Sequence, residues 1–292
     1  MSLESIKKSN SLDKILAAVK TETAPVEKQS YVDERLWTPE LDKSGNGYAV
    51  IRFLPSSDNE AMPWAKLWNH AFQGPTGKWF IENSLTTLNQ KDPVSEYNSS
   101  LWNSGVESDK EIARRQKRKL QYYSNIYVVA DPQHQENEGK VFLFRYGKKI
   151  FDKLMEALQP QFEDETPVNP FDLDTGANFK LKIRKVDGYW NYDKSEFDSS
   201  SKLDNQDKVV ESLYSLAEFT APSNFKTYDE LKSRLNDVLT GTQSSSSSAE
   251  DVELNDNVET DVEDKQYVDK VVSTTKESDD SLDYFQKLAK EA

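Results

Sequence analysis

The chain has 292 residues, no cysteine, only two histidines and a formal net charge of −14 at pH 7. The lack of cysteine excludes disulfides, thiolate nucleophiles and sulfur-ligated metal sites, and two histidines leave little for general-base chemistry. With 36% hydrophobic and 11% aromatic residues, the composition predicts one globular core with polar ends. No apolar run reaches the roughly 18 residues of a membrane helix and no signal peptide is evident, so we expect a soluble cytoplasmic protein.

The negative charge is concentrated at the carboxyl end. From Glu250 onward there are 14 acidic and 5 basic residues, whereas residues 1–249 hold 37 acidic and 32 basic residues. A nearly balanced body is therefore joined to an acidic tail. The net charge alone does not argue against a nucleic-acid partner.

An amphipathic helix is predicted near the amino end. Its apolar positions follow the i, i+3, i+4, i+7 spacing of one helix face, and they are Leu12, Ile15, Leu16 and Val19. The basic run of Lys7 and Lys8, followed by Ser9, precedes this helix. We expect residues 1–24 to form an arm that docks either on another surface or, with equal weight, on its own domain.

The middle of the chain alternates apolar segments with turn residues, which predicts a mixed α+β domain. Strands are expected at residues 48–54, 64–72, 77–81, 125–130, 140–146 and 178–186. Helices are expected at 147–158, 209–217 and 228–238, the last behind a capping box of Thr227 and Glu230. Residues 83–109 are polar and are predicted to be irregular, and residues 188–192 are predicted to form an aromatic turn.

The clearest strand is 178–186, because its side chains alternate strictly between two faces. Its apolar face is formed by Phe179, Leu181 and Ile183 and its cationic face by Lys180, Lys182 and Arg184. The first face is predicted to be buried and the second to meet solvent or a polyanion.

The strongest functional signal is the stretch from Lys110 to Tyr123, which is predicted to be partly helical. It holds six cations against the single anion Glu111 and runs into two tyrosines. Cations that track phosphates and rings that stack on bases suit single-stranded nucleic acid. Taken alone, the run suits a solvated charged helix face equally well.

Segments that pair aromatic with basic residues recur through the middle of the chain, which favours the nucleic-acid interpretation. The residues expected to contact DNA are Arg52, Trp79, Arg114, Arg115, Lys117, Arg118, Lys119, Tyr122, Tyr123, Arg145, Tyr146, Lys148, Lys149, Lys182, Tyr189 and Tyr192. Most of the aromatic rings must nevertheless lie in the core. Tyr122, Tyr123, Tyr146 and Tyr192 are favoured at the rim of a groove, because a phenol tolerates partial hydration.

A serine-rich linker at residues 244–248 precedes the acidic tail, which is expected to be disordered. Such a tether holds a polyanion at high local concentration beside a cationic surface, where it competes with nucleic acid. One more amphipathic segment, with Leu282, Phe285 and Leu288 on one face, is expected to fold on a partner protein.

Over roughly residues 40–240 the chain resembles the replicative single-stranded DNA-binding protein of T-even-like bacteriophages. The resemblance rests on the order of several runs: GNGYAVIRFLPS at 45–56, NH at 69–70, GKW at 77–79, KRK at 117–119, ENEGKVF at 136–142, GKKI at 147–150 and GANF at 176–179. Together these runs are specific, although each alone is weak.

The resemblance implies an OB-fold β-barrel core at residues 25–243, with peripheral helices, that binds single strands cooperatively and without sequence preference. It implies roles in replication, recombination and repair, in the cytoplasm of an infected bacterial host. The arm at 1–24, through Lys7, Lys8 and Ser9, is implied to mediate self-association along DNA. The tail at 244–292 is implied to recruit phage replication and recombination proteins.

One departure from the family is large. Its zinc module uses one histidine and three cysteines, and only His70 stands at a matching position here. One histidine with oxygen ligands does not make a structural zinc site, so no metal or other cofactor is expected. The lobe at 83–109 that replaces the module is expected either to be held by apolar contacts of Leu85, Leu88, Tyr97 and Trp102 or to be mobile without DNA.

Two other classes of function stay open at this point. A metal-dependent nuclease is disfavoured, because no spaced set of Asp and Glu residues at strand ends and no phosphate loop is found, so an enzyme is not expected. The alternative to DNA binding is an acidic-tailed interaction scaffold, in which the tail does the main work and the basic stretch is only solvated.

Overall fold

A computed structural model describes residues 33–57, 62–162, 164–186 and 188–240. The chain divides into two units, residues 1–34 and 35–292, and the architecture below is that of the described part of the second unit. The predicted arm with Lys7, Lys8 and Ser9 lies outside the described residues, as does the tail with Leu282, Phe285 and Leu288.

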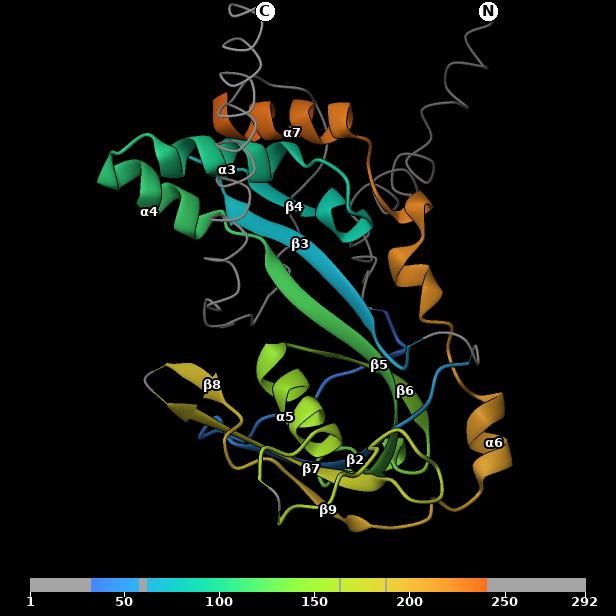
Figure 1. Cartoon of the computed structure of the whole chain (residues 1–292). Coiled ribbons are helices and arrows are strands. Elements are labelled where there is room, and N and C mark those ends of the chain that lie inside the picture. Colours follow the sequence, from blue (N-terminus) through green and yellow to red (C-terminus); the bar gives the residue numbers. More distant parts are fainter. Residues whose placement is uncertain (1–32, 58–61, 163, 187, 241–292) are drawn as a thin grey trace, which may run out of the picture. The chain divides into compact units, whose positions relative to one another are not determined.

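The described strands form a nine-stranded sheet that is accompanied by helices, as expected for an α+β protein (Figure 1). The strands are β1 (Leu36–Trp37), β2 (Gly47–Phe53), β3 (Ala65–Gln73), β4 (Trp79–Asn83), β5 (Lys119–Ala130), β6 (Val141–Tyr146), β7 (Ala177–Val186), β8 (Tyr189–Asn191) and β9 (Glu196–Ser200). Their order is β1-β6-β5-β2-β7-β8, while β3 joins β5, β4 joins β3 and β9 joins β7. All pairs are antiparallel except that of β1 with β6.

This order is open, because no pairing among the described strands joins the two ends of the sheet. The structure thus shows a mixed α+β domain without a closed barrel. The longest strand, β5, pairs with β3 through Lys119 to Tyr123 and with β2 through Ile126 to Ala130. It therefore runs through both parts of the sheet, as Figure 1 shows in green.

The helices occupy positions between and after the strands. The α-helices are α3 (Pro93–Asn103), α4 (Glu107–Arg115), α5 (Lys148–Leu158), α6 (Gln206–Glu211) and α7 (Tyr228–Thr240), and the 3₁₀ turns are η1 (Leu85–Leu88), η2 (Gln135–Asn137), η3 (Ala217–Thr220) and η4 (Pro222–Asn224). The capping box before α7 is confirmed, since Thr227 N donates to Glu230 Oε2 at 2.8 Å and Glu230 N donates to Thr227 Oγ1 at 3.4 Å. None of the helices in the described ranges is long and apolar enough to cross a membrane.

The prediction that residues 83–109 are irregular is wrong, because η1, α3 and the start of α4 lie there. Helix α3 begins with Asp92 as its N-cap, whose carboxylate accepts from Ser95 N at 2.9 Å, and with Pro93 in its first turn. Within α3 only Pro93 and Val94 are buried. The helix therefore needs no apolar repeat along its length, and the sequence pattern gave no sign of it. Two expected anchors are confirmed, since Leu85 is buried and Tyr97 packs against the same cluster.

Two other elements differ from expectation. The aromatic turn at 188–192 contains β8, and β9 was not predicted, because its sequence is polar. The helix expected at 209–217 is the shorter α6, after which the chain continues into η3.

Two hydrophobic clusters support the two parts of the sheet. The first is built on β2, β5, β6, β7 and α5, and it includes the predicted apolar face of β7, where Phe179 and Leu181 are fully buried. The second lies between the β3–β4 hairpin and the helices α3 and α7, around Phe72, Phe80 and Leu231. The surface between these two clusters is where the candidate site lies.

Candidate nucleic-acid interface

One face of β3 and β5 is covered at both ends and partly exposed in the middle. Side chains alternate across a strand, so Lys66, Trp68 and His70 share a face of β3, and the pairings place Tyr122 of β5 opposite Lys66. His70 is buried beside the start of α3. Tyr122 is stacked under Phe151 of α5, with ring centroids 4.0 Å apart. Trp68 is half-buried between these two covered positions.

Two cations flank the ring of Trp68. The guanidinium carbon of Arg118 lies 4.0 Å from the ring centroid and Lys66 Nζ lies 5.5 Å from it. Cation–π contacts of this kind contribute about 0.5–2 kcal/mol, depending on solvation. We call Lys66, Trp68 and Arg118 the Trp68 patch. An aromatic ring with two adjacent cations can stack on a base while the cations meet phosphates.

Hydrogen bonds to neighbouring segments fix the Trp68 patch. Trp68 N donates to Thr87 Oγ1 at 2.9 Å, which ties β3 to η1. The residues before Arg118 are held through the carbonyl oxygen of Gln116, which accepts from Asn98 Nδ2 at 3.0 Å and lies 3.2 Å from His70 Nδ1. The patch is therefore positioned by the lobe at 83–109 as well as by the sheet.

The basic stretch from Lys110 to Tyr123 is split between elements, and the prediction of a partly helical segment is confirmed. Helix α4 ends at Arg115, a short link follows, and β5 begins at Lys119. On α4, Arg114 lies over the ring of Trp102 at 5.4 Å and pairs with Glu107 at 3.0 Å. Lys117 and Arg118 in this link and Lys119 at the start of β5 are half-buried, and Arg118 brings this part of the stretch against Trp68.

Three of the tyrosines expected at a groove rim are instead buried. Tyr122, Tyr123 and Tyr146 are 4%, 7% and 4% exposed. Tyr123 stacks on Phe219 of η3 at 4.1 Å, and Tyr146 shares a 2.8 Å hydrogen bond with Ser124 Oγ. Burial raises the pKa of Tyr146 above its ordinary value. The expectation that these rings line an exposed rim is wrong, because α5 and η3 cover them.

Arg52 was expected to contact DNA and is instead fully buried. Its Nη2 donates to the carbonyl oxygens of Asp172 and Ser201, both at 2.9 Å. Desolvation lowers the pKa of Arg52, while the charge of Asp172 acts in the opposite direction. The guanidinium thus satisfies main-chain acceptors inside the protein and presents no charge to a phosphate.

The cationic face of β7 is matched by carboxylates. Lys182 Nζ lies 2.7 Å from Glu196 of β9, and Lys180 Nζ lies 2.7 Å from Asp198. The hydrogen bond from Lys182 lowers the pKa of Glu196. Because β9 was not predicted, these partners were not anticipated, and Lys182 is not the open phosphate contact that the alternation suggested. Each exposed ion pair of this kind contributes little to stability, so the lysines can exchange these carboxylates for other anions.

The remaining predicted residues are spread over several surfaces. Trp79 is 43% exposed, but it pairs with Gln73 and so lies on the opposite face of the hairpin from Trp68. Tyr189 is 50% exposed on β8, and Tyr192 packs against the first cluster. The others are on helix α4, strand β6 and the first turn of α5, and they are Arg115, Arg145, Lys148 and Lys149, of which Lys148 bonds Asp152 Oδ1 at 3.0 Å.

Sequence reasoning missed Trp68. The signal available was the pair Lys66 and Trp68 at alternate positions of the predicted strand 64–72, which places a cation and a ring on one face. The decisive partner, Arg118, lies in the link directly before β5, so the patch depends on the β3–β5 pairing.

Comparisons with known proteins match the part of the chain that contains this surface. The family described as gp32 DNA binding protein like matches residues 45–239. The chain is 42% identical over 216 residues to a single-stranded DNA-binding protein of Enterobacteria phage T2, covering 71% of this chain and 70% of that protein. It is 41% identical over 216 residues to the single-stranded DNA-binding protein of Enterobacteria phage T4, covering 71% of each. A similar protein of Enterobacteria phage RB70 is 43% identical over 93 residues, which are 31% of this chain and 77% of that protein.

Proposed function

Because the chain belongs to the family described as gp32 DNA binding protein like, we propose that it binds single-stranded DNA without sequence preference, through the Trp68 patch. The relatives in phages T2 and T4 are named for single-strand binding. The observation that carries the assignment to this surface is the contact of both Arg118 and Lys66 with one half-buried tryptophan ring.

The mechanism follows from the chemistry of the patch. A base stacks on the exposed part of the Trp68 ring, and the two cations meet the phosphates on either side of it. Lys117 and Lys119 extend the positive charge along the start of β5. Stacking tolerates any base, and duplex DNA hides its base faces, so the patch selects for strandedness and not for sequence.

A binding titration tests the proposal. Fluorescence anisotropy of a labelled oligothymidylate should show binding at low salt that weakens as salt rises, with a logarithmic slope of about −0.7 for each phosphate contacted. A duplex of equal length should bind more weakly. No affinity for single strands at low salt would favour the acidic-tailed interaction scaffold instead, and magnesium-dependent strand cleavage would point to an enzyme.

Further proposals about the core fold, the amino-terminal arm and the cellular role rest on the resemblance to the phage single-stranded DNA-binding proteins. We propose that the core is an open variant of the OB-fold, that the arm with Lys7, Lys8 and Ser9 promotes cooperative self-association on DNA, and that the protein acts in replication, recombination and repair in the infected host. The segment with Leu282, Phe285 and Leu288 would bind a phage replication or recombination protein. Loss of cooperativity on removal of residues 1–24, measured on long single strands, tests the arm.

The acidic tail is proposed to compete with DNA for the cationic surface. Its 14 acidic residues are tethered by the serine linker, so they act at high local concentration. Ending the chain after Gln243 should tighten single-strand binding at low salt and have little effect at high salt, where the competition is screened. Equal affinity of the shortened and full chains at low salt would contradict this mechanism.

A further inference from the structure

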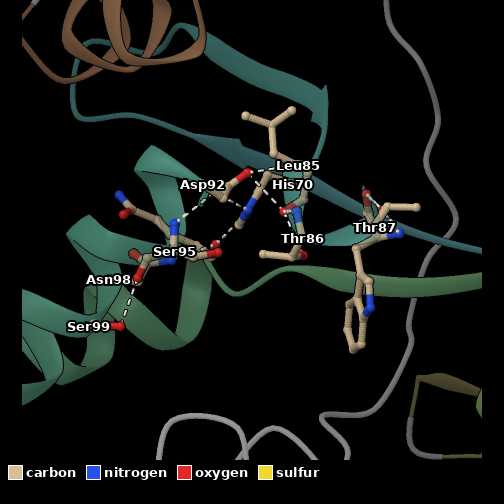
Figure 2. Close-up of polar contacts among 11 residues, drawn as sticks. His70, Leu85, Thr86, Thr87, Asp92, Ser95, Asn98 and Ser99 are labelled. Atoms are coloured by element: carbon tan, nitrogen blue, oxygen red, sulfur yellow. Dashed lines mark hydrogen bonds and ion pairs between the residues drawn. The ribbon is translucent and has the colours of Figure 1, made fainter. Parts of the chain in front are cut away.

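A buried polar cluster lies where the lobe meets β3. His70 Nε2 is 3.2 Å from Asp92 Oδ1, and the two side chains are 2% and 0% exposed (Figure 2). Asp92 Oδ2 accepts from Ser84 Oγ at 2.9 Å and from Leu85 N at 3.0 Å, and Asp92 Oδ1 accepts from Ser95 N at 2.9 Å. We call His70, Ser84, Asp92 and Ser95 the His70 cluster.

The His70 cluster is built around a buried contact between an imidazole and a carboxylate. One ring nitrogen of His70 faces the carboxylate of Asp92 and the other faces the carbonyl oxygen of Gln116 at 3.2 Å. Both ring nitrogens of His70 therefore face oxygen atoms that can accept a hydrogen bond. Burial raises the pKa of Asp92, but the hydrogen bond and charge of His70, aided by Ser95 N and Ser84, hold it well below its ordinary value.

The donor set of the His70 cluster does not fit a structural zinc ion. Such sites use thiolates and imidazoles, whereas this cluster offers one imidazole, one carboxylate, the hydroxyl of Ser84 and the main-chain N–H of Ser95. The carboxylate already accepts three hydrogen bonds besides its contact with His70. Within the described ranges, no group of three or more His, Cys, Asp or Glu side chains is placed to hold a metal ion.

We propose that the His70 cluster replaces the zinc centre of this family, tying the lobe together without any metal, through the buried contact of His70 with Asp92 and the hydrogen bonds that Asp92 accepts. Its members come from β3, from the link between β4 and η1, and from the start of α3. Through the carbonyl oxygen of Gln116 the cluster also holds the segment that carries Arg118 over Trp68. His70 and Asp92 are thus positioning residues for the Trp68 patch, and this last step alone rests on the proposed function.

Metal content and thermal stability test the replacement directly. Protein produced in zinc-supplemented medium should contain far less than one zinc per chain, and a chelator should leave its unfolding midpoint unchanged. Stoichiometric zinc in the wild-type protein would overturn the proposal, whatever the DNA affinity. Because neither readout involves DNA, failure here is distinct from failure of the proposed single-strand binding.

Substitution of the pair tests its structural role. Asp92→Asn or His70→Gln leaves the other member buried without its native partner, which should lower the unfolding midpoint by roughly 10 °C, with or without chelator. Ser99→Ala is the matched control, because Ser99 Oγ donates only to Ser95 O on the same helix, at 2.9 Å, and takes no part in the pair. Midpoints equal to that of Ser99→Ala would overturn the proposal.

Conversion of the cluster to a metal site provides a gain-of-function test. The combined variant Ser84→Cys, Asp92→Cys and Ser95→Cys adds three thiols on the segments that meet at Asp92 and His70, which gives the Cys₃His set of a structural zinc site. It should bind one zinc per chain, give thiolate-to-cobalt absorption with Co²⁺, and become sensitive to chelators. At a temperature well below its unfolding midpoint, Asp92→Asn should bind single strands more weakly than the wild-type protein. The zinc-loaded triple variant should recover that affinity. A folded triple variant that binds no metal would overturn the proposal.

Discussion

Replacing Trp68 with leucine should weaken binding to single-stranded DNA by roughly 5- to 150-fold, because stacking of one base on an aromatic ring contributes about 1–3 kcal/mol. Leucine preserves an apolar side chain beside the two covered ends of this face, so the fold is retained. The measurement is anisotropy of a labelled oligothymidylate at one fixed salt concentration. Circular dichroism and the unfolding midpoint establish that the variant is folded.

Trp79→Leu is the matched control for this substitution. Trp79 is 43% exposed on the same hairpin but faces the opposite side. Its replacement should change affinity by less than about twofold, within the range of a neutral surface substitution. The reverse ranking, with Trp79 more important than Trp68, would place the DNA on the other face of the β3–β4 hairpin.

Arg118→Gln should reduce the magnitude of the salt slope by about 0.7, the contribution of one phosphate contact on a single strand.

Replacing Arg52 with methionine should destabilise the fold by about 2–5 kcal/mol without a specific loss of DNA affinity. The carbonyl oxygens of Asp172 and Ser201 each lose a charged donor at 2.9 Å, and an unsatisfied buried acceptor costs about 1–3 kcal/mol. Urea unfolding followed by tryptophan fluorescence measures the loss of stability. Affinity per folded molecule should equal that of the wild type, since the guanidinium is fully buried.

Arg145→Met supplies the comparison, because Arg145 is an exposed arginine on the neighbouring part of the sheet. It should cost less than about 0.5 kcal/mol of stability. Gly176→Ala should act like Arg52→Met, because a Cβ there would lie 2.3 Å from Asp172 O and 2.8 Å from Arg52 Nη2. If Arg52→Met were as stable as Arg145→Met but bound DNA poorly, Arg52 would be a contact residue after all.

Elements with strong local periodicity could be predicted from the sequence, and those held by distant partners could not. Strand β7 and helix α5 have clear alternating or helical apolar faces, and both lie where they were expected. Helix α3 buries little beyond its first turn, so its apolar signal is weak. Strand β9 is polar and is held beside β7 partly by ion pairs, which no local pattern reveals.

The same distinction applies to the candidate site. The basic run containing Arg118 is evident in the sequence, but its aromatic partner Trp68 is 50 residues away and becomes visible only once β3 and β5 are paired. Tyr122 and Tyr123 were predicted as ring surfaces because they adjoin cations. Whether a ring on a strand is exposed depends on what packs over it, and here the covering rings are Phe151 and Phe219.

Strand β5 has a mechanical consequence for the domain. Four of its 12 residues, Leu120, Tyr122, Ile126 and Val128, belong to the first hydrophobic cluster, while its amino half is paired with β3, which carries Phe72 of the second cluster. The β3–β4 hairpin is therefore joined to the rest of the sheet by paired, hydrogen-bonded strands as well as by the connecting segments of the chain. Twisting or bending of the paired strands β3 and β5 would change the separation of the two hydrophobic clusters, and the hydrogen bonds between these strands oppose such a change.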